Sequence, residues 1–269
     1  MKTLVFLKLG GALITDKDTP HTTRQQVLDR VCSEIAQALR AQPDLQLLLG
    51  HGSGSFGHVP AARFQTRNGV NTPDEWMGFI EVWREAKALN TIVMQSLAAQ
   101  GISAISFAPS AQVRTTGKRV KTWDLCAIKS SLEHGLVPVV YGDVVFDDQI
   151  GATILSTEEQ FDHLARQLNP RTILLAGIEP GVWKNFPDKQ QLLESIHPAD
   201  REEVILHLGG SSSIDVTGGM RSKVLSMLDL VSAGYCSEVY IFSGLEEGTI
   251  FNLLSGRPTG TRIGTNGKE

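Results

Sequence analysis

The chain has 269 residues, 41% of them hydrophobic, and can bury a sizeable core without help from metals or disulfides. Its 25 Lys and Arg residues against 29 Asp and Glu residues give a formal net charge of -4 at pH 7. Such a chain has no long-range attraction for nucleic acid or for an anionic membrane. No stretch approaches the ~18 consecutive apolar residues of a membrane span. Composition therefore argues against nucleic acid and membrane partners and favours a small-molecule ligand.

The cysteines and the first residues indicate the compartment. Cys32, Cys126 and Cys236 are far apart and form no Cys-x-x-Cys pair, so the sequence encodes neither a disulfide framework nor a zinc cluster. The opening stretch MKTLVFLKLGG has a short apolar run, but Lys8 interrupts it too early for the core of a signal peptide. We therefore expect a cytoplasmic protein.

Short apolar runs alternate along the chain with longer amphipathic ones. In chain order the pattern predicts strand 3–10, helix 23–41, strand 45–50, helix 74–101, strand 103–109, helix 123–135, strand or hairpin 136–147, helix 158–169, strand 171–177, helix 220–234, strand 237–244 and helix 245–256. The strands are continuously hydrophobic, which is typical of a parallel sheet covered by helices on both faces. The sequence thus predicts an α/β fold, an αβα sandwich with a mostly parallel central sheet.

No repeat and no low-complexity linker divides the chain. We therefore expect one domain over 1–269, with a soft boundary near residue 150 between two lobes, 1–150 and 151–269.

Glycine turns follow the predicted strands, where parallel sheets bind ligands through free backbone N–H groups. In KLGGA (8–12), Gly10 and Gly11 let the backbone approach an anion closely, and Lys8 can reach the same anion. Taken alone, a Gly-Gly pair after a strand is more often only a tight turn.

The second turn, HGSGSFGH (51–58), has the G-x-G-x-x-G spacing of dinucleotide-binding proteins. That fingerprint needs a further strand ending in an acid about 20 residues later, and 58–75 holds no such strand. A nucleophile elbow needs a glycine two residues before the serine, which neither Ser53 nor Ser55 has. We interpret the turn as an anion cradle, with N–H groups from Ser53 to Gly57, two hydroxyls and His58 as donors. The alternative is that His51 and His58 merely cap the turn.

Two further turns carry charge. DVTGGMRSK (215–223) opens a helix with Lys223 in its first turn, which the helix dipole disfavours unless an anion also binds there; otherwise Lys223 is a solvated surface lysine. In VVYGDVVFD, Gly142 and Asp143 stand at a strand end, where a buried carboxylate needs a lysine or Mg²⁺ as partner. Four glycine turns with two lysines and no nucleophile–base pair indicate an enzyme that positions phosphates, which is phosphoryl transfer.

Six motifs, in order and across essentially the whole chain, resemble the amino acid kinase family: KLGGALITDK, HGSGSFGH, VPVVYGDVVFD, ILSTEEQ, DVTGGMRSKV and GRPTGTRI. The histidine of GSFGH makes the chain most similar to the members that phosphorylate isopentenyl phosphate; members that act on fosfomycin share it. The resemblance implies an ATP- and Mg²⁺-dependent homodimeric kinase with an N-terminal acceptor lobe and a C-terminal ATP lobe.

The resemblance also implies a role for each matching residue. Lys8 and Lys223 would hold the transferring phosphoryl group from opposite sides, and Lys17 would add positive charge at the donor phosphates. His58 would be an electrostatic and positioning group, because an acceptor that is already an anion needs no general base. The implied ATP-binding residues are Lys8, Gly10, Gly11, Ala12, Lys17, Gly177, Gly181, Trp183, Gly218, Gly219 and Lys223. No metal site on the protein is implied, since Mg²⁺ accompanies ATP.

The acceptor needs a pocket for its organic part. Trp76, Phe79, Ile80 and Trp83 share one helix face, which is usually core, but here the face follows directly after the cradle. An apolar pocket with few polar groups suits a five-carbon alkenyl chain. The expected acceptor-binding residues are Gly52, Ser53, Gly54, Ser55, Gly57, His58, Phe79, Trp83, Gly142, Asp143 and Ile154.

Two departures from the family pattern stand out. Ser53 replaces a usual glycine in the cradle, and STEE replaces the usual SGD, which leaves Glu158 or Glu159 near the place of an aspartate that organises the lysines. A kinase for another small phosphate or phosphonate, such as fosfomycin, is the nearest alternative. A ligand-sensing member of the fold without turnover is the other.

Overall fold

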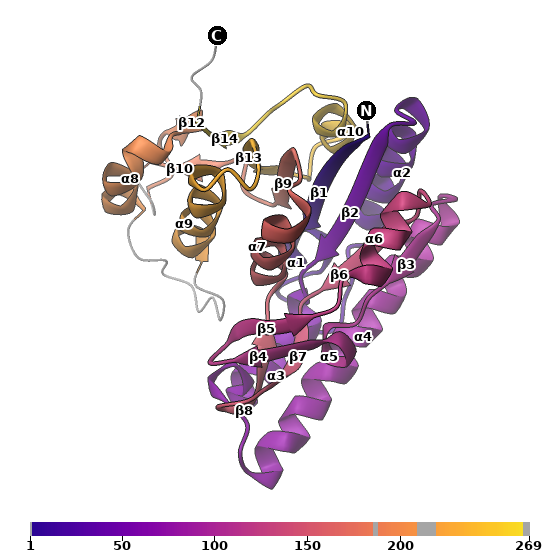
Figure 1. Ribbon diagram of the computed structural model, residues 1–269, viewed down its shortest axis with the longest axis vertical. Helices are drawn as coiled ribbons and strands as arrows, with labels where there is room; N and C mark the ends of the chain where they lie inside the picture. Colours follow the sequence, from indigo (N-terminus) through magenta and orange to yellow (C-terminus); the bar gives the residue numbers. More distant parts are fainter. Residues whose placement is uncertain (1, 185–187, 209–218, 266–269) are drawn as a thin grey trace.

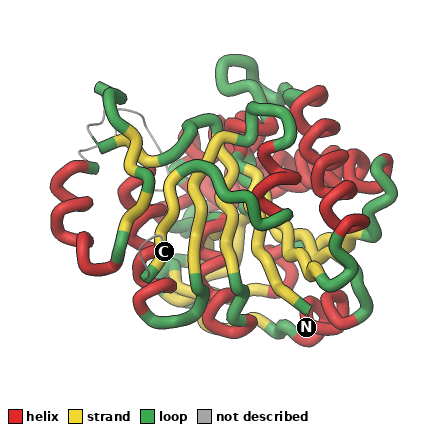
Figure 2. The backbone as a smooth tube through the Cα atoms, turned by 90° about the horizontal axis from the view of Figure 1, so that it is seen from above, coloured by secondary structure: helices red, strands yellow, loops and turns green. Residues whose placement is uncertain are grey.

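The strand β1 (Thr3–Leu9) lies inside a large sheet in the computed structural model, which describes residues 2–184, 188–208 and 219–265. Within these residues the sheet has eight strands in the order β12-β14-β13-β9-β1-β2-β6-β3 (Figures 1 and 2). Every neighbouring pair is parallel except β13 and β14. The other seven strands are β2 (Leu45–His51), β3 (Ala104–Ser106), β6 (Val137–Tyr141), β9 (Thr172–Gly177), β12 (Ser195–Ile196), β13 (Glu238–Ser243) and β14 (Thr261–Gly264).

Helices cover both faces of this sheet, because each buried strand is apolar on both sides. On one face α2 (Gln25–Ala41), α4 (Pro73–Ala99) and α10 (Thr249–Leu254) pack against Leu7 and Leu9. On the other face α6 (Cys126–Glu133), α7 (Thr157–Leu168) and α9 (Gly219–Ser232) pack against Phe6. This arrangement confirms the predicted α/β fold with a mostly parallel central sheet.

The remaining helices are short, apart from one at the cradle. They are α1 (Gly11–Ile14), α3 (Gly54–Phe64), η1 (Thr66–Asn68), α5 (Pro109–Gln112), η2 (Pro198–Asp200) and α8 (Arg201–His207). The strands β10 (Val182–Trp183) and β11 (Leu192–Leu193) form a separate antiparallel pair. None of the helices described in 2–184, 188–208 and 219–265 is long and apolar enough to cross a membrane.

A second sheet lies below the first in Figure 1. One of its residues, Ile154, lines the cavity that is described below as the candidate active site. Its order is β5-β4-β7-β8, with the strands β4 (Val113–Thr116), β5 (Arg119–Trp123), β7 (Asp143–Asp147) and β8 (Gly151–Leu155). The β4–β5 hairpin was not predicted from the sequence; Gly117 and Lys118 form its turn with positive φ angles of 55° and 70°. The predicted strand or hairpin 136–147 divides at Gly142 instead, with β6 in the large sheet and β7 in the small one.

Candidate active site

A cavity of about 530 Å³ lies at the carboxyl ends of β1, β2, β9 and β13. Parallel sheets bind their ligands at this edge, since strand ends and helix starts meet there. Predicted site residues make up much of its wall: Lys8, Gly10, Gly11, Ala12, Lys17, Gly52, Ser53, Gly54, Ser55, His58, Gly142, Ile154, Gly177 and Lys223.

The first two glycine turns touch each other inside this cavity. A Cβ placed on Gly11 would lie 2.4 Å from the Gly54 nitrogen and 2.6 Å from its Cα, closer than real Cβ contacts. Thr15 joins the turns, because its hydroxyl accepts from the Ser55 N–H at 3.0 Å and donates to the Gly11 carbonyl at 2.8 Å. The turns are therefore held as one unit in which no side chain separates the two backbones.

The backbone bonds decide which N–H groups an anion can use. Gly10 donates to the Ala176 carbonyl, whereas Gly11 and Ala12 have no backbone hydrogen-bond acceptor in the described part of the chain. In the cradle the Ser55 N–H donates to the Thr15 hydroxyl, and the N–H groups of Phe56 and Gly57 donate to the Ser53 carbonyl, which leaves the N–H groups of Ser53 and Gly54. The cavity thus has one pair of donors at each turn, fewer than the stretch Ser53–Gly57 suggested.

The cradle also holds side-chain donors. The Ser55 hydroxyl is buried and has no partner among the described residues, so it lacks an acceptor that a bound phosphate would supply. His58 lies exposed in the cavity wall, four residues into α3. Ser53 has a φ of -79°, which any residue adopts, so the cradle accepts serine in place of the usual glycine.

Two lysines meet at one carboxylate. Side chains alternate along β1, so Lys8 points to the same face as Phe6, toward α7 and α9. Its Nζ donates to Oε1 of Glu158, and the Nζ of Lys223 lies 3.8 Å from the same oxygen. Burial alone would raise the pKa of Glu158, but the ammonium groups of Lys8 and Lys223 lower it to about 2. The carboxylate therefore stays ionised and holds the two cations together.

Local chemistry places Glu158 at this point. Ser156 caps α7 and forms a capping box with Glu159, so the helix begins with Glu158 in its first turn, where the helix dipole favours an acid. The Thr157 hydroxyl donates to the His51 carbonyl at 2.7 Å and ties the helix start to β2. Of the two glutamates considered from the sequence, Glu158 lies between the lysines and Glu159 serves the cap.

Lys17 lines the cavity and lies on a loop whose two ends are hydrogen-bonded to each other. Thr15 and Thr23 form an isolated bridge, and Asp16 N–H donates to the Thr22 carbonyl at 2.9 Å. Glu179 lines the cavity as well: burial raises its pKa, but bonds from Lys189 and Trp183 and the charge of Lys17 lower it overall.

Several predicted residues lie outside the cavity wall. Gly57, Phe79, Trp83, Asp143, Gly181, Trp183 and Gly219 are not part of it, and Gly218 is outside the described residues. Phe79 is 5% exposed and packs on Trp76 and Phe146, with Trp83 and Ile154 beside this small core. Ile154 alone of this group also lines the cavity.

Asp143 and Trp183 have partners of their own. Asp143 accepts from the N–H groups of Ser110 and Val144 and from the Ser110 side chain, and no lysine of the described residues pairs with it. Burial raises the pKa of Asp143 to about 6. The Trp183 indole donates to the carboxylate of Glu179 at 2.8 Å, so Trp183 contacts a wall residue without lining the cavity itself.

The prediction missed some wall residues, which include Pro20, Val59, Thr157, Met220, Ile241 and Phe242. Ile241 and Phe242 end the parallel strand β13 beside β9, and that pairing is the signal that could have found them.

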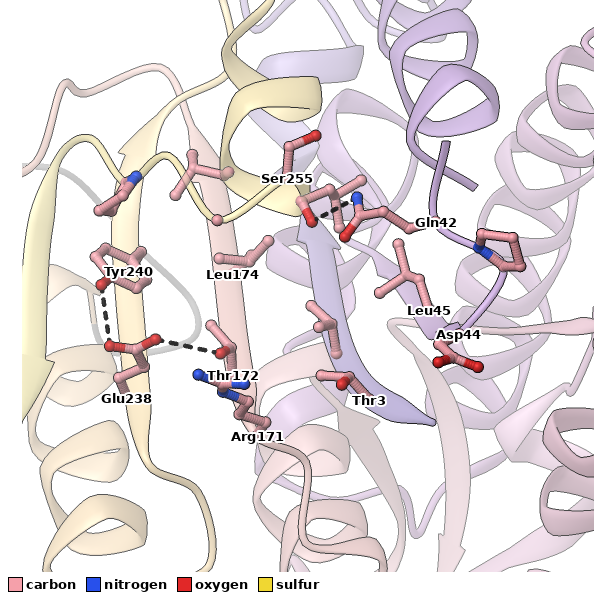
Figure 3. A pocket seen from close by; sticks show the side chains of 16 residues that line it. Thr3, Gln42, Asp44, Leu45, Arg171, Thr172, Leu174, Glu238, Tyr240 and Ser255 are labelled. Carbon is pink, nitrogen blue, oxygen red and sulfur yellow. Dashed lines mark hydrogen bonds between the residues drawn. The ribbon is translucent and has the colours of Figure 1, made fainter. Parts of the chain in front are cut away.

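A larger cavity of about 650 Å³ opens at the opposite edge, at the amino ends of β1, β9 and β13 (Figure 3). Glu238 in its wall accepts from Tyr240 at 3.0 Å and from Thr172 at 3.5 Å. None of the predicted site residues lines it. Chemistry, not size, therefore identifies the smaller cavity as the candidate active site.

The chain is also similar to proteins of a known family. The model of the amino acid kinase family matches residues 3–243. Isopentenyl phosphate kinases from Methanocaldococcus jannaschii and Methanothermobacter thermautotrophicus are 34% and 35% identical, each over 97% of this chain and 98% of the relative. A solved isopentenyl phosphate kinase structure superimposes with a TM-score of 0.82 at 32% identity, covering 97% of this chain and 99% of that one.

The contact between the turns predicts the effect of Gly11→Ala. The new Cβ would meet backbone atoms of Gly54, which cannot rotate away, so we expect a loss of about 1–3 kcal/mol in the free energy of unfolding. Urea unfolding measures it. Gly142→Ala is the matched control, because its Cβ finds nothing closer than 3.8 Å and should leave stability unchanged. Equal stability of the two variants would contradict the contact.

Proposed function

The chain belongs to the amino acid kinase family, and from that premise we propose that it transfers the γ-phosphoryl group of ATP to isopentenyl phosphate. The products are isopentenyl diphosphate and ADP. One observation carries the proposal: Lys8 and Lys223 converge on Glu158 beside two glycine turns whose N–H groups suit phosphates. The full-length similarity to isopentenyl phosphate kinases supports the choice of acceptor.

The lysine cluster would stabilise the group in transfer. An oxygen of the acceptor phosphate bonds to the γ-phosphorus as the bond to the β-phosphate oxygen breaks, and ADP leaves with those electrons. Lys8 and Lys223 would neutralise the charge on the transferring oxygens, while Glu158 fixes both ammonium groups beforehand. The acceptor arrives as an anion, so no residue needs to remove a proton.

ATP would lie along the β1 and β9 side of the cavity. Gly11 and Ala12 would donate N–H groups to its phosphates, with Lys17 adding charge above them. The stretch from Gly177 to Glu179 and the end of β13 would line the nucleotide, with Gly181, Trp183 and Gly219 just behind the wall.

Magnesium would enter with ATP. Within the described ranges no group of three or more His, Cys, Asp or Glu side chains could hold a metal ion, and Glu158 is committed to two lysines. The nucleotide phosphates would supply the ligands of the magnesium ion.

The acceptor would occupy the cradle. Its phosphate would receive the N–H groups of Ser53 and Gly54, the Ser55 hydroxyl and the His58 ring. Val59 and Ile154 are apolar residues of the cavity wall and would contact the hydrocarbon chain. Phe79 and Trp83 would act as a second layer that supports Ile154.

The two alternatives have no observation in their favour. The STEE departure suggested a member of the fold without turnover, but Glu158 occupies the place between the lysines and keeps the cluster intact. Nothing in the cavity favours a phosphonate over a phosphate monoester. We also propose a homodimer in the cytoplasm, on the family resemblance and on three unpaired cysteines.

The first test is a coupled assay of ADP release with a panel of small monophosphates and fosfomycin. We expect kcat/KM for isopentenyl phosphate to exceed that for fosfomycin by at least about 10-fold, because the apolar wall residues Val59 and Ile154 match an alkenyl chain better than a polar epoxide ring. A blank without acceptor measures background hydrolysis. Turnover of fosfomycin alone would identify a phosphonate kinase, and no acceptor-dependent ADP would identify a binding protein.

The second test removes one of the three side chains that would bind phosphate, one variant at a time. Lys223→Ala, Lys8→Ala and His58→Ala should each lower kcat about 10²- to 10³-fold, as expected for preorganised donors to transition-state charge. Lys121→Ala is the control, since Lys121 pairs with Asp148 on the exposed hairpin and should keep wild-type turnover. Wild-type kcat in Lys223→Ala would refute the role given to that lysine.

A further inference from the structure

Arg67 binds the segment that carries Glu158 from outside the cavity. It lies in η1, three residues after the end of α3. Its guanidinium donates to both carboxylate oxygens of Glu159 and to the Ile154 carbonyl. Its own carbonyl accepts from the Thr153 hydroxyl at 3.0 Å. Arg67 is therefore hydrogen-bonded both to the end of β8 and to the first turn of α7.

Glu159 connects Arg67 to the first residues of α7. The Glu159 Oε2 atom accepts from the Ser156 N–H and from the Ser156 hydroxyl, each at 2.8 Å, while the guanidinium holds the same carboxylate. The capping box and the ion pair thus share one side chain. Because Glu158 is the adjacent residue, its backbone can move only when this shared arrangement moves.

Arg67 does not belong to the cavity wall, and its side chain is 19% exposed. A partly buried Arg–carboxylate fork is directional and holds its partners in one plane more firmly than a surface ion pair. The Thr157 hydroxyl anchors the same helix turn on the other side, to β2. The first turn of α7 is thereby fixed from two directions, and one of them is Arg67.

We propose that Arg67 is a positioning residue for phosphoryl transfer, which keeps Glu158 between Lys8 and Lys223 by fixing Glu159 and the Ile154 carbonyl. The inference rests on the proposed function and adds to it a residue that touches neither substrate. It also gives the STEE sequence a reason: the second glutamate serves the clamp so that the first can serve the lysines.

The inference has an electrostatic consequence. The charges of Lys8 and Lys223 hold the pKa of the buried Glu158 carboxyl at about 2, although burial alone would raise it. If the clamp is broken and Glu158 moves away from the lysines, the pKa of Glu158 should rise. A residue that merely stabilised the fold would not produce this change.

The test compares Arg67→Met, which removes the fork, with Arg67→Lys, which keeps one donor, and with Glu159→Gln. With isopentenyl phosphate we expect Arg67→Met to lower kcat about 10- to 10²-fold, because small misplacements reach the reacting atoms. KM for both substrates should change less than about threefold, since the cradle is intact. The acidic limb of the kcat profile should move to higher pH, because Glu158 away from the lysines is protonated more easily, and Arg67→Lys should recover part of both effects.

Double substitution tests whether the two side chains act together. Arg67→Met with Glu159→Gln should cost no more than Arg67→Met alone, because partners in one network are not additive. Arg63→Met is the matched control: Arg63 is exposed near the end of α3 and its guanidinium lies over Phe64, away from α7. It should leave kcat and the pH profile unchanged.

A readout without acceptor separates this inference from the proposed function. In the ligand-free protein, the Cδ chemical shift of Glu158 followed against pH by NMR should titrate at higher pH in Arg67→Met than in the wild type. If the wild-type protein showed no turnover, the proposed function would be refuted, but the ligand-free titration would still test the role of Arg67. An unchanged Glu158 titration, or a fall in kcat that only matches a fall in folded protein, would overturn the role of Arg67.

Discussion

The Glu158 carboxylate lets two ammonium groups share one small space, and the rest of the site depends on it. Two unit charges about 4 Å apart repel by about 4 kcal/mol in a partly buried setting, so Lys8 and Lys223 need a counter-charge there. Glu158 supplies it at the start of α7, where the Ser156 cap and the helix dipole both favour an acid. The cluster is prepared before any phosphate arrives, and a phosphoryl group in transfer meets charges already in place.

Local sequence patterns were enough to place the backbone parts of the site. Gly10, Gly11 and the cradle glycines stand at strand ends, and the edge of a parallel sheet brings strand ends together, so the cavity could be anticipated. The contact of Gly11 with Gly54 explains why both turns need glycine, since a Cβ would force the backbones apart. The α/β class followed equally from continuous hydrophobic strands.

Side-chain partners across long sequence distances could not be predicted in the same way. Lys8 and Glu158 are 150 residues apart, and only the packed sheet with α7 and α9 brings them together. The choice between Glu158 and Glu159 was readable in principle, because Ser156 and Glu159 have the spacing of a capping box. Phe79 was placed at a pocket because an apolar helix face does not reveal what covers it; here Trp76 and Phe146 do. Asp143 found its partners in backbone N–H groups, which sequence does not display.

A crystal structure with a non-hydrolysable ATP analogue and isopentenyl phosphate tests the central claim most directly. The account predicts that the Nζ atoms of Lys8 and Lys223 both contact the γ-phosphate, that Glu158 still touches Lys8, and that the acceptor phosphate receives the Ser53 and Gly54 N–H groups. A γ-phosphate bound by only one of these lysines, or an acceptor phosphate bound away from the cradle, would contradict it.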